Sequence, residues 1–335
     1  MTLPLERLTS QDFGRRDNRA RSFGRWLLLR ALMGITTLAI VSVLVFTATQ
    51  ALPGDVARLI LGPDATTDQL LQLRSNLHLD DPVVDQYLGW AGGLLRGDLG
   101  VSLASGAPVL QEITPRLLNS LFLVGASMII SVPLSIVLGV FTAVQRDGIA
   151  DRFLLQFSMI ANAIPDFVLG LLLVVLFGTT VFHLFPPVAL IPLGEGPLAH
   201  LDRMVLPVMT IVIMCTTYLY RLVRSSFIDV LGSEFIQMAE LRGLGKLRIL
   251  FLHALPNATG ALIQASSISV AVILGGLVVI ENVFNYNGIG MLLSNAIQTH
   301  DLPLMQGVIL LIATAFFVCN FVADILAGER SGSEA

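Results

Sequence analysis

The chain has 335 residues, of which 54% are hydrophobic and only 13% are charged, against about 25% charged residues in a typical soluble protein. A soluble protein of this size could not cover its surface with so few charged residues. The composition therefore excludes a soluble protein and predicts a multi-pass membrane protein. The formal net charge is −4, and there is no basic stripe of the kind that binds nucleic acid.

Six apolar segments are long enough to cross a bilayer, which takes about 20 residues. They are expected at residues 26–51, 117–144, 153–177, 205–220, 259–279 and 304–325. We predict an all-α membrane protein with one transmembrane domain over residues 25–328. The Arg-rich residues 1–24 are expected to be a disordered cytoplasmic tail, and residues 329–335 a short cytoplasmic tail.

The basic residues orient these spans, because cytoplasmic loops of membrane proteins are enriched in Lys and Arg. If the N-terminus is cytoplasmic, most of the 20 Lys and Arg residues fall on the inside. The exceptions are Arg58, Arg74, Arg96, Arg116 and Arg203. Both termini are then cytoplasmic, and the outer loops run over about 52–116, 178–204 and 280–303.

The first outer loop is unusually long for a connection between helices, and it has helical signals of its own. Asp81 precedes Pro82, which predicts an N-cap followed by a proline in the first helical turn. Tyr87 and Trp90 follow at helical spacing, and their rings suit a membrane interface. Thr67 predicts the start of another helix, so we expect two short helices on the outer face.

A nucleotide-binding loop needs the pattern Gly-x-x-x-x-Gly-Lys-[Ser/Thr]. The nearest sequence is Gly245-Lys246, but Glu240 stands at the first glycine position and Leu247 at the hydroxyl position. The histidines are scattered and there is no His-Glu-x-x-His pattern. We therefore expect no catalytic, cofactor-binding or metal-binding residues in this chain.

A charged, amphipathic loop over residues 221–257 separates the fourth and fifth spans. Its first part has an apolar stripe of Phe235, Met238, Ala239 and Leu241. Charged residues stand beside or opposite the stripe, at Glu234, Glu240 and Arg242. The sequence Gly243-Leu244-Gly245 then allows a sharp turn that other residues would resist, and Pro256 opens the next span. The pattern predicts a helix–turn–helix knob, which either docks in a partner's groove or lies on the lipid surface.

The order of residues in this loop resembles the coupling motif of the permeases of ABC importers. Ala239-Glu240, Gly243 three residues on, and Leu255-Pro256 fit that motif, although Glu240-Leu241 stands where the motif has small residues. Other segments resemble the first of the two permeases of dipeptide, oligopeptide and nickel importers. They are residues 52–55, 77–90, 96–102, 278–290 and 301–307. Together with the coupling motif, these segments are spread across most of residues 25–327.

The resemblance implies a type I importer permease fold with six transmembrane helices in a bacterial inner membrane. It also implies a second related permease, two cytoplasmic ATPases that hold ATP and magnesium, and an external solute-binding protein. That protein would dock on the first outer loop, which includes Asp81, Tyr87, Trp90 and Asp98. The expected substrates are dipeptides or oligopeptides, with nickel chelates, haem and glutathione as alternatives. Lipid is the remaining partner, and no nucleic acid is expected.

Few polar side chains mark a path through the spans. Asp166 follows Pro165 midway along the third apolar segment, and a carboxylate inside a membrane span indicates function by default. It contacts the substrate, caps a helix that restarts after Pro165, or lies in a wet cavity. Ser267 and Glu281 are further candidates, with helix packing and interfacial solvation as the other interpretations.

Two other classes of protein remain as alternatives. A secondary transporter would need inverted repeats and charges for coupling ions within the membrane, and the sequence has no evident repeat. A membrane-embedded enzyme would need clustered acid, base or nucleophile residues near the membrane surface.

Overall fold

The computed structural model describes residues 6–51, 56–62, 64–76, 79–192 and 194–331. Its α-helices are α1 (Glu6–Gln50), α2 (Val56–Leu61), α3 (Thr67–Asn76), α4 (Val83–Leu95), α5 (Val109–Val144), α6 (Ile149–Ala163), α7 (Asp166–Leu173), α8 (Leu201–Leu231), α9 (Glu234–Leu241), α10 (Lys246–Ile249), α11 (Leu255–Val283), α12 (Ile289–Thr299) and α13 (Leu302–Ser331). Short π or 3-10 segments lie at Val174–Thr179, Pro197–His200 and Leu250–Ala254. Within the described ranges the chain forms no strand beyond one isolated bridge, so the predicted all-α class is confirmed.

Four of these helices are long and apolar enough to cross a membrane on their own. They are Gly24–Gln50 within α1, the whole of α5, Pro197–Leu231 (α8 and the 3-10 turn before it) and Leu302–Val322 within α13. The pair α6 and α7 would make a fifth span, bent by 104° at the break. The break falls at Pro165, as the sequence predicted. In α11 the described apolar stretch, Ile268–Val283, is shorter. Six spans therefore remain a prediction.

The fourth span differs from its expected limits. The helix α8 has 31 residues and ends at Leu231, so the fourth span expected at residues 205–220 was too short. The helix α1 begins at Glu6, but the side chains of residues 6–23 lie outside the described residues. The disordered tail expected over residues 1–24 stays a prediction.

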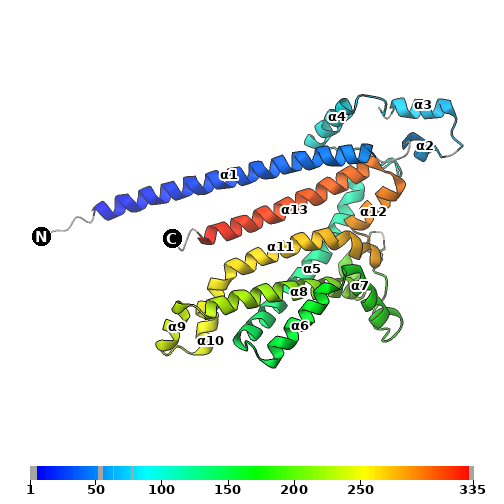
Figure 1. Ribbon diagram of the computed structural model, residues 1–335. Coiled ribbons are helices and arrows are strands. Elements are labelled where there is room, and N and C mark those ends of the chain that lie inside the picture. Colours follow the sequence, from blue (N-terminus) through cyan, green and yellow to red (C-terminus); the bar gives the residue numbers. More distant parts are fainter. Residues whose placement is uncertain (1–5, 52–55, 63, 77–78, 193, 332–335) are drawn as a thin grey trace.

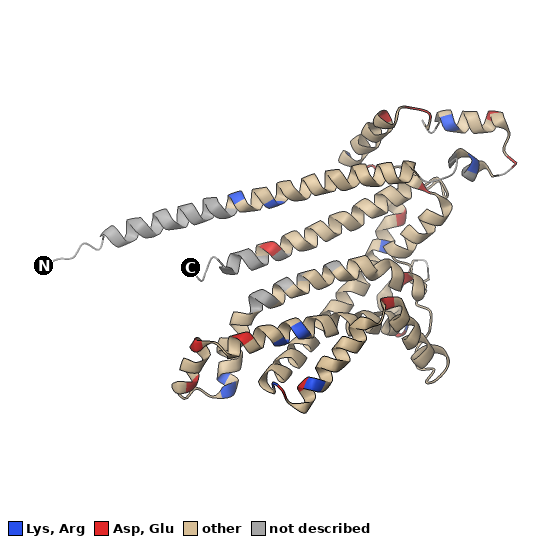
Figure 2. Ribbon diagram, viewed as in Figure 1, with Lys and Arg blue, Asp and Glu red and all other residues tan. Residues whose placement is uncertain are grey.

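The long helices lie side by side in the order α1, α13, α11 and α8, with α5 packed along α8 (Figure 1). Both termini lie at the end of this bundle that carries α9 and α10, and α2 to α4 lie at the opposite end (Figure 1). Among the described residues, charged ones gather near the helix ends and in the short helices, and the middles of the long helices hold few of them (Figure 2). This distribution is what a bilayer requires of lipid-facing helices.

Small residues let α5 approach α8 closely. Ser127, Ser131, Ser135 and Gly139 recur every four residues along α5, and all four are buried. A Cβ atom at Gly139 would lie 2.5 Å from Cγ1 of Val223 on α8. Such a stripe is typical of packed membrane helices, because small side chains allow close backbone contact.

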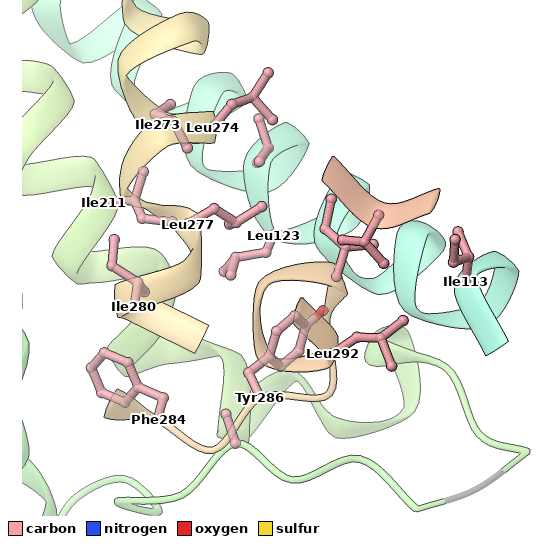
Figure 3. Packing of buried hydrophobic residues seen from close by; sticks show 14 of the residues in the cluster. Ile113, Leu123, Ile211, Ile273, Leu274, Leu277, Ile280, Phe284, Tyr286 and Leu292 are labelled. Carbon is pink, nitrogen blue, oxygen red and sulfur yellow. The ribbon is translucent and has the colours of Figure 1, made fainter. Parts of the chain in front are cut away.

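The main hydrophobic core lies where α5, α8 and α11 meet, toward the end that carries α12. Leu123, Ile211 and Leu277 pack together there (Figure 3). Below them, Phe284 and Tyr286 are fully buried. The hydroxyl of Tyr286 donates a hydrogen bond to the Asn119 carbonyl of α5 at 2.6 Å, which satisfies its polar tip.

Candidate functional site

A helix, a tight turn and a second helix form the knob of residues 232–254 between α8 and α11. Gly243 in the turn has φ of +73°, the left-handed region that favours glycine. Its amide donates to the Glu240 carbonyl at 2.9 Å, and the Leu244 amide donates to the Ala239 carbonyl at 3.3 Å. These bonds close the end of α9 as a left-handed C-cap. The predicted helix–turn–helix is confirmed.

The inner face of the knob is apolar and buried. Ile236 and Ala239 on α9 pack with Phe227 of α8 and Ile249 of α10 in a second hydrophobic cluster. Ala239, which was expected to be part of a docking stripe, therefore faces inward. Because closely packed interiors deform little, this cluster joins the knob rigidly to the ends of the long helices.

The outer face of the knob exposes large apolar side chains. Phe235, Met238, Leu241 and Leu247 are 53%, 54%, 82% and 72% exposed. Charged residues surround them, with Glu234, Glu240 and Arg242 all exposed. A cluster of apolar side chains with a polar rim marks a contact with a protein or a membrane.

The two other predicted residues of this loop lie at its margins. Leu244 is half-buried against the second hydrophobic cluster. Pro256 is exposed in the first turn of α11, directly after the π segment Leu250–Ala254, and it lacks the amide that would continue the helical hydrogen bonds. Leu244 therefore supports the turn, and Pro256 marks the start of the following helix.

An ion pair behind the knob was not found from the sequence. Asp151 in the first turn of α6 is buried and accepts two hydrogen bonds from the guanidinium of Arg224 on α8. The sequence placed both residues near the cytoplasmic side but gave no sign that they meet, because they are 73 positions apart. Bidentate hydrogen bonding of a carboxylate by arginine is strong and fixes the relative orientation of the two side chains.

Asp166 lies in a cavity of about 130 Å³ between α6, α7, α8 and α11. It is the first residue of α7, with Pro165 at the N-cap position. Capping was therefore the wrong interpretation, because Pro165 holds the cap position and Asp166 is already helical. Asp166 does line a cavity, as the third interpretation expected. Pro165 contributes the break that separates α6 from α7 and does not line the cavity itself.

Glu281 does not face a path. It is fully buried and accepts hydrogen bonds from the amides of Gly290 at 2.7 Å and Met291 at 3.1 Å. The hydroxyl of Ser120 on α5 donates a third bond at 2.5 Å. Glu281 thus satisfies the free amides at the start of α12, and interfacial solvation was the wrong interpretation as well. The Ser267 side chain lies outside the described residues.

The opposite end of the molecule carries three short helices, α2 to α4, where two were expected. Thr66 and Gln69 form a reciprocal cap at the start of α3, with bonds of 3.3 Å and 3.0 Å. Asp81 is not the N-cap of α4, because Pro82 holds that position and the helix begins at Val83. A proline can hold the cap position because its fixed φ suits the extended backbone there.

The aromatic residues of α4 pack against α1. Tyr87 and Trp90 lie 5.4 Å and 5.7 Å from the ring of Phe46, and the Tyr87 hydroxyl lies 2.9 Å from that of Ser42. The Asp98 carboxylate accepts a bond from the Gly100 amide at 2.9 Å, which holds a turn. These residues shape the segment of α2 to α4, and its place on the outer side of a membrane remains a prediction.

Comparisons with known proteins agree with this architecture. Residues 135–328 match the family of binding-protein-dependent transport system inner membrane components. Residues 23–123 match the N-terminal family of membrane components of the same transport systems. A probable peptide ABC transporter permease of Sinorhizobium fredii is 33% identical over 90% of this chain and 96% of its own length. The glutathione transport system permease GsiC of Escherichia coli is 33% identical over 89% of this chain and 95% of its own.

Proposed function

The chain belongs to the family of binding-protein-dependent transport system inner membrane components, and on that premise we propose that it forms half of the path by which an ABC importer takes up peptides. Members of the family are permeases and not ATPases. The observation that carries the proposal is the knob, whose exposed apolar face stands on a buried, rigid base. That combination suits a contact that must transmit movement.

The proposed mechanism is alternating access driven from outside this subunit. ATP and magnesium bind to partner ATPases, and the outer face of the knob docks in a groove on one of them. The knob can drive the spans only if it binds the two ATPase states with different free energy. Ile236 and Ala239 then carry the displacement into α8 and α10, and the same hydrophobic cluster extends to Ala258 and Leu262 of α11.

The proposed assembly holds a second related permease, two ATPases and an external solute-binding protein. The family itself implies ATPase and binding-protein partners. Docking of the binding protein on α2 to α4 is supported by their place at the end of the bundle opposite the knob (Figure 1). The opposite ends of one subunit would then meet the ATPase and the binding protein.

We place the knob and both termini in the cytoplasm, with α11 as an additional span that brings the number to six. Two features support this topology. At 1.5 Å per residue, the 29 residues of α11 extend roughly 44 Å, which exceeds the ~30 Å of a bilayer's hydrocarbon core. The termini and the knob also lie at one end of the bundle (Figure 1).

Peptides are the substrate class that the relatives favour. The Sinorhizobium relative is named for peptide transport and the Escherichia coli relative for glutathione transport. Both names describe small molecules with amide bonds. We therefore retain glutathione as the nearer alternative, ahead of nickel chelates and haem.

Co-purification tests this function directly. The tagged chain is extracted in mild detergent, and the subunits that come with it are identified by mass spectrometry. We expect a second permease and one or two P-loop ATPases. Recovery of a homo-oligomer without an ATPase would contradict the proposal and favour a secondary transporter.

A further inference from the structure

The cavity beside Asp166 combines an apolar wall with one charge. Its apolar lining includes Ile211 and Met214 from α8 and Ile273 and Ile280 from α11. A volume of about 130 Å³ corresponds to roughly four water molecules. The cavity therefore admits a small group or one end of a peptide, and is too small for a whole peptide.

The carboxylate of Asp166 has no opposite charge beside it. Among the described lining residues, it is the only side chain that carries a charge. None of the ion pairs found in the described part of the chain includes it. A carboxylate within a membrane span is costly unless a cation or water compensates it.

A glycine on the facing helix leaves room for this carboxylate. A Cβ atom placed on Gly276 of α11 would lie 3.0 Å from Oδ2 of Asp166. The neighbouring polar residues are neutral, and two of them already donate to their own helices. The amide of Asn162 donates to the Ser158 carbonyl at 2.8 Å, and the Ser269 hydroxyl donates to the Ala265 carbonyl at 3.0 Å. The third neutral polar residue, Tyr218, contributes a hydroxyl, so the described lining holds no cation that could balance Asp166.

We propose that this cavity binds the primary ammonium group of the transported substrate, with Asp166 as its counter-ion. The proposal rests on the proposed function, since it names the part of a peptide that the permease itself recognises. An ammonium group would offset the cost of the isolated carboxylate, and the apolar wall would accept the carbon atoms next to it. The substrate class is thus a peptide with a free amino group.

Cys215 supplies a reporter, because it lines the same cavity and the chain has only one other cysteine, Cys319. In membrane vesicles that hold the complete importer with Cys319→Ser, the rates of modification by 2-aminoethyl and ethyl methanethiosulfonate are compared. The two reagents differ in charge and little in size. We expect the ammonium reagent to react roughly tenfold faster, because a charged pocket concentrates counter-ions. Asp166→Asn should bring the two rates close together, and Asp166→Glu should restore the preference.

Protection against the ethyl reagent then tests binding itself. Alanyl-alanine should slow the labelling of Cys215 several-fold, and N-acetyl-alanyl-alanine should not. Protection by Nα-acetyl-lysine amide as well would show that a side-chain amine is accepted, and protection by the dipeptide alone would assign the site to the N-terminus. Either result supports an ammonium site. Equal protection by the acetylated dipeptide would overturn it.

A second reporter covers the case in which buried Cys215 reacts with neither reagent. Asn162 is exposed on the cavity rim, so Asn162→Cys in a Cys215→Ser, Cys319→Ser background allows the same comparison. Equal rates for both reagents at both positions would refute the proposal. Charge selectivity without peptide uptake by the importer would contradict the proposed function and leave the ammonium site standing.

Discussion

Arg224 on α8 holds the carboxylate of Asp151 on α6 with two hydrogen bonds, from Nε to Oδ1 at 2.5 Å and from Nη2 to Oδ2 at 2.6 Å. Oδ2 of Asp151 also accepts a bond from the Asp147 amide at 2.9 Å. The pair therefore fixes the turn before α6 to α8, roughly two helical turns from the knob. Any displacement of the knob along α8 should reach α6 through this pair.

Asp151→Asn should destabilise the chain, because it leaves the Arg224 guanidinium, whose side chain is only 16% exposed, without its buried counter-charge. Removing one partner of a buried pair costs about 3–5 kcal/mol. Thermal unfolding of the purified chain in detergent measures the effect. The control is Asp324→Asn, which breaks the half-exposed pair of Asp324 with Arg30 at 2.9 Å and should cost ~1 kcal/mol or less. Equal losses from both variants would show that the Asp151 pair does not hold α6 to α8.

Gly243→Val should separate ATP hydrolysis from uptake. Gly243 has φ of +73°, and a β-branched residue there costs at least about 1–2 kcal/mol. The end of α9 should shift, so the importer would hydrolyse ATP with little peptide uptake while the chain still inserts in the membrane. Both activities are measured in reconstituted vesicles.

Gly245→Val is the matched control for this turn. Gly245 has φ of −67°, and a Cβ atom there would meet no other atom within 4 Å. Transport by this variant should stay close to that of the unchanged chain. Normal uptake by Gly243→Val would contradict the role of the turn in coupling.

Leu241→Asp should weaken the contact with the ATPase. Leu241 is 82% exposed at the end of α9, and a charge at the centre of an apolar contact would have to be desolvated. Central contact residues typically contribute about 2 kcal/mol or more, which is at least a tenfold change in affinity. The ATPase recovered with the tagged permease is quantified. Leu95→Asp is the control, since Leu95 is 91% exposed on α4 at the other end of the molecule. Unchanged recovery with Leu241→Asp would place the docking surface elsewhere.

Ser120→Ala should destabilise the end of the bundle that carries α12. The Ser120 hydroxyl donates to Glu281 and accepts from the Ile289 amide at 2.9 Å, so its loss leaves two buried groups short of a partner, at about 1–3 kcal/mol. Ser127→Ala is the control, because that buried hydroxyl donates only to the Leu123 carbonyl of its own helix. Thermal unfolding should separate the two variants. A larger loss from Ser127→Ala would show that Glu281 does not depend on Ser120.

Several features of the knob could be predicted from a short stretch of sequence. A sharp turn at Gly243 follows from the conformational freedom of glycine, and the helices on either side follow from their apolar periodicity. Which face would be buried could not be predicted. Ala239 and Met238 are neighbours in one apolar stripe, but Ala239 is buried and Met238 is exposed, because α9 is oriented by its contact with Phe227.

Hydropathy, charge and turn residues are properties of consecutive positions, so the sequence by itself determined the membrane class, the helical fold, the break at Pro165 and the family. The tertiary structure alone decided which distant residues meet. Asp151 pairs with Arg224 across 73 positions, and Ser120 with Glu281 across 161. Such pairs depend on how each helix is rotated about its axis when it packs. Polar residues in an apolar helix give no periodic signal of that rotation, since a single residue can face a partner, a cavity or lipid with the same local sequence.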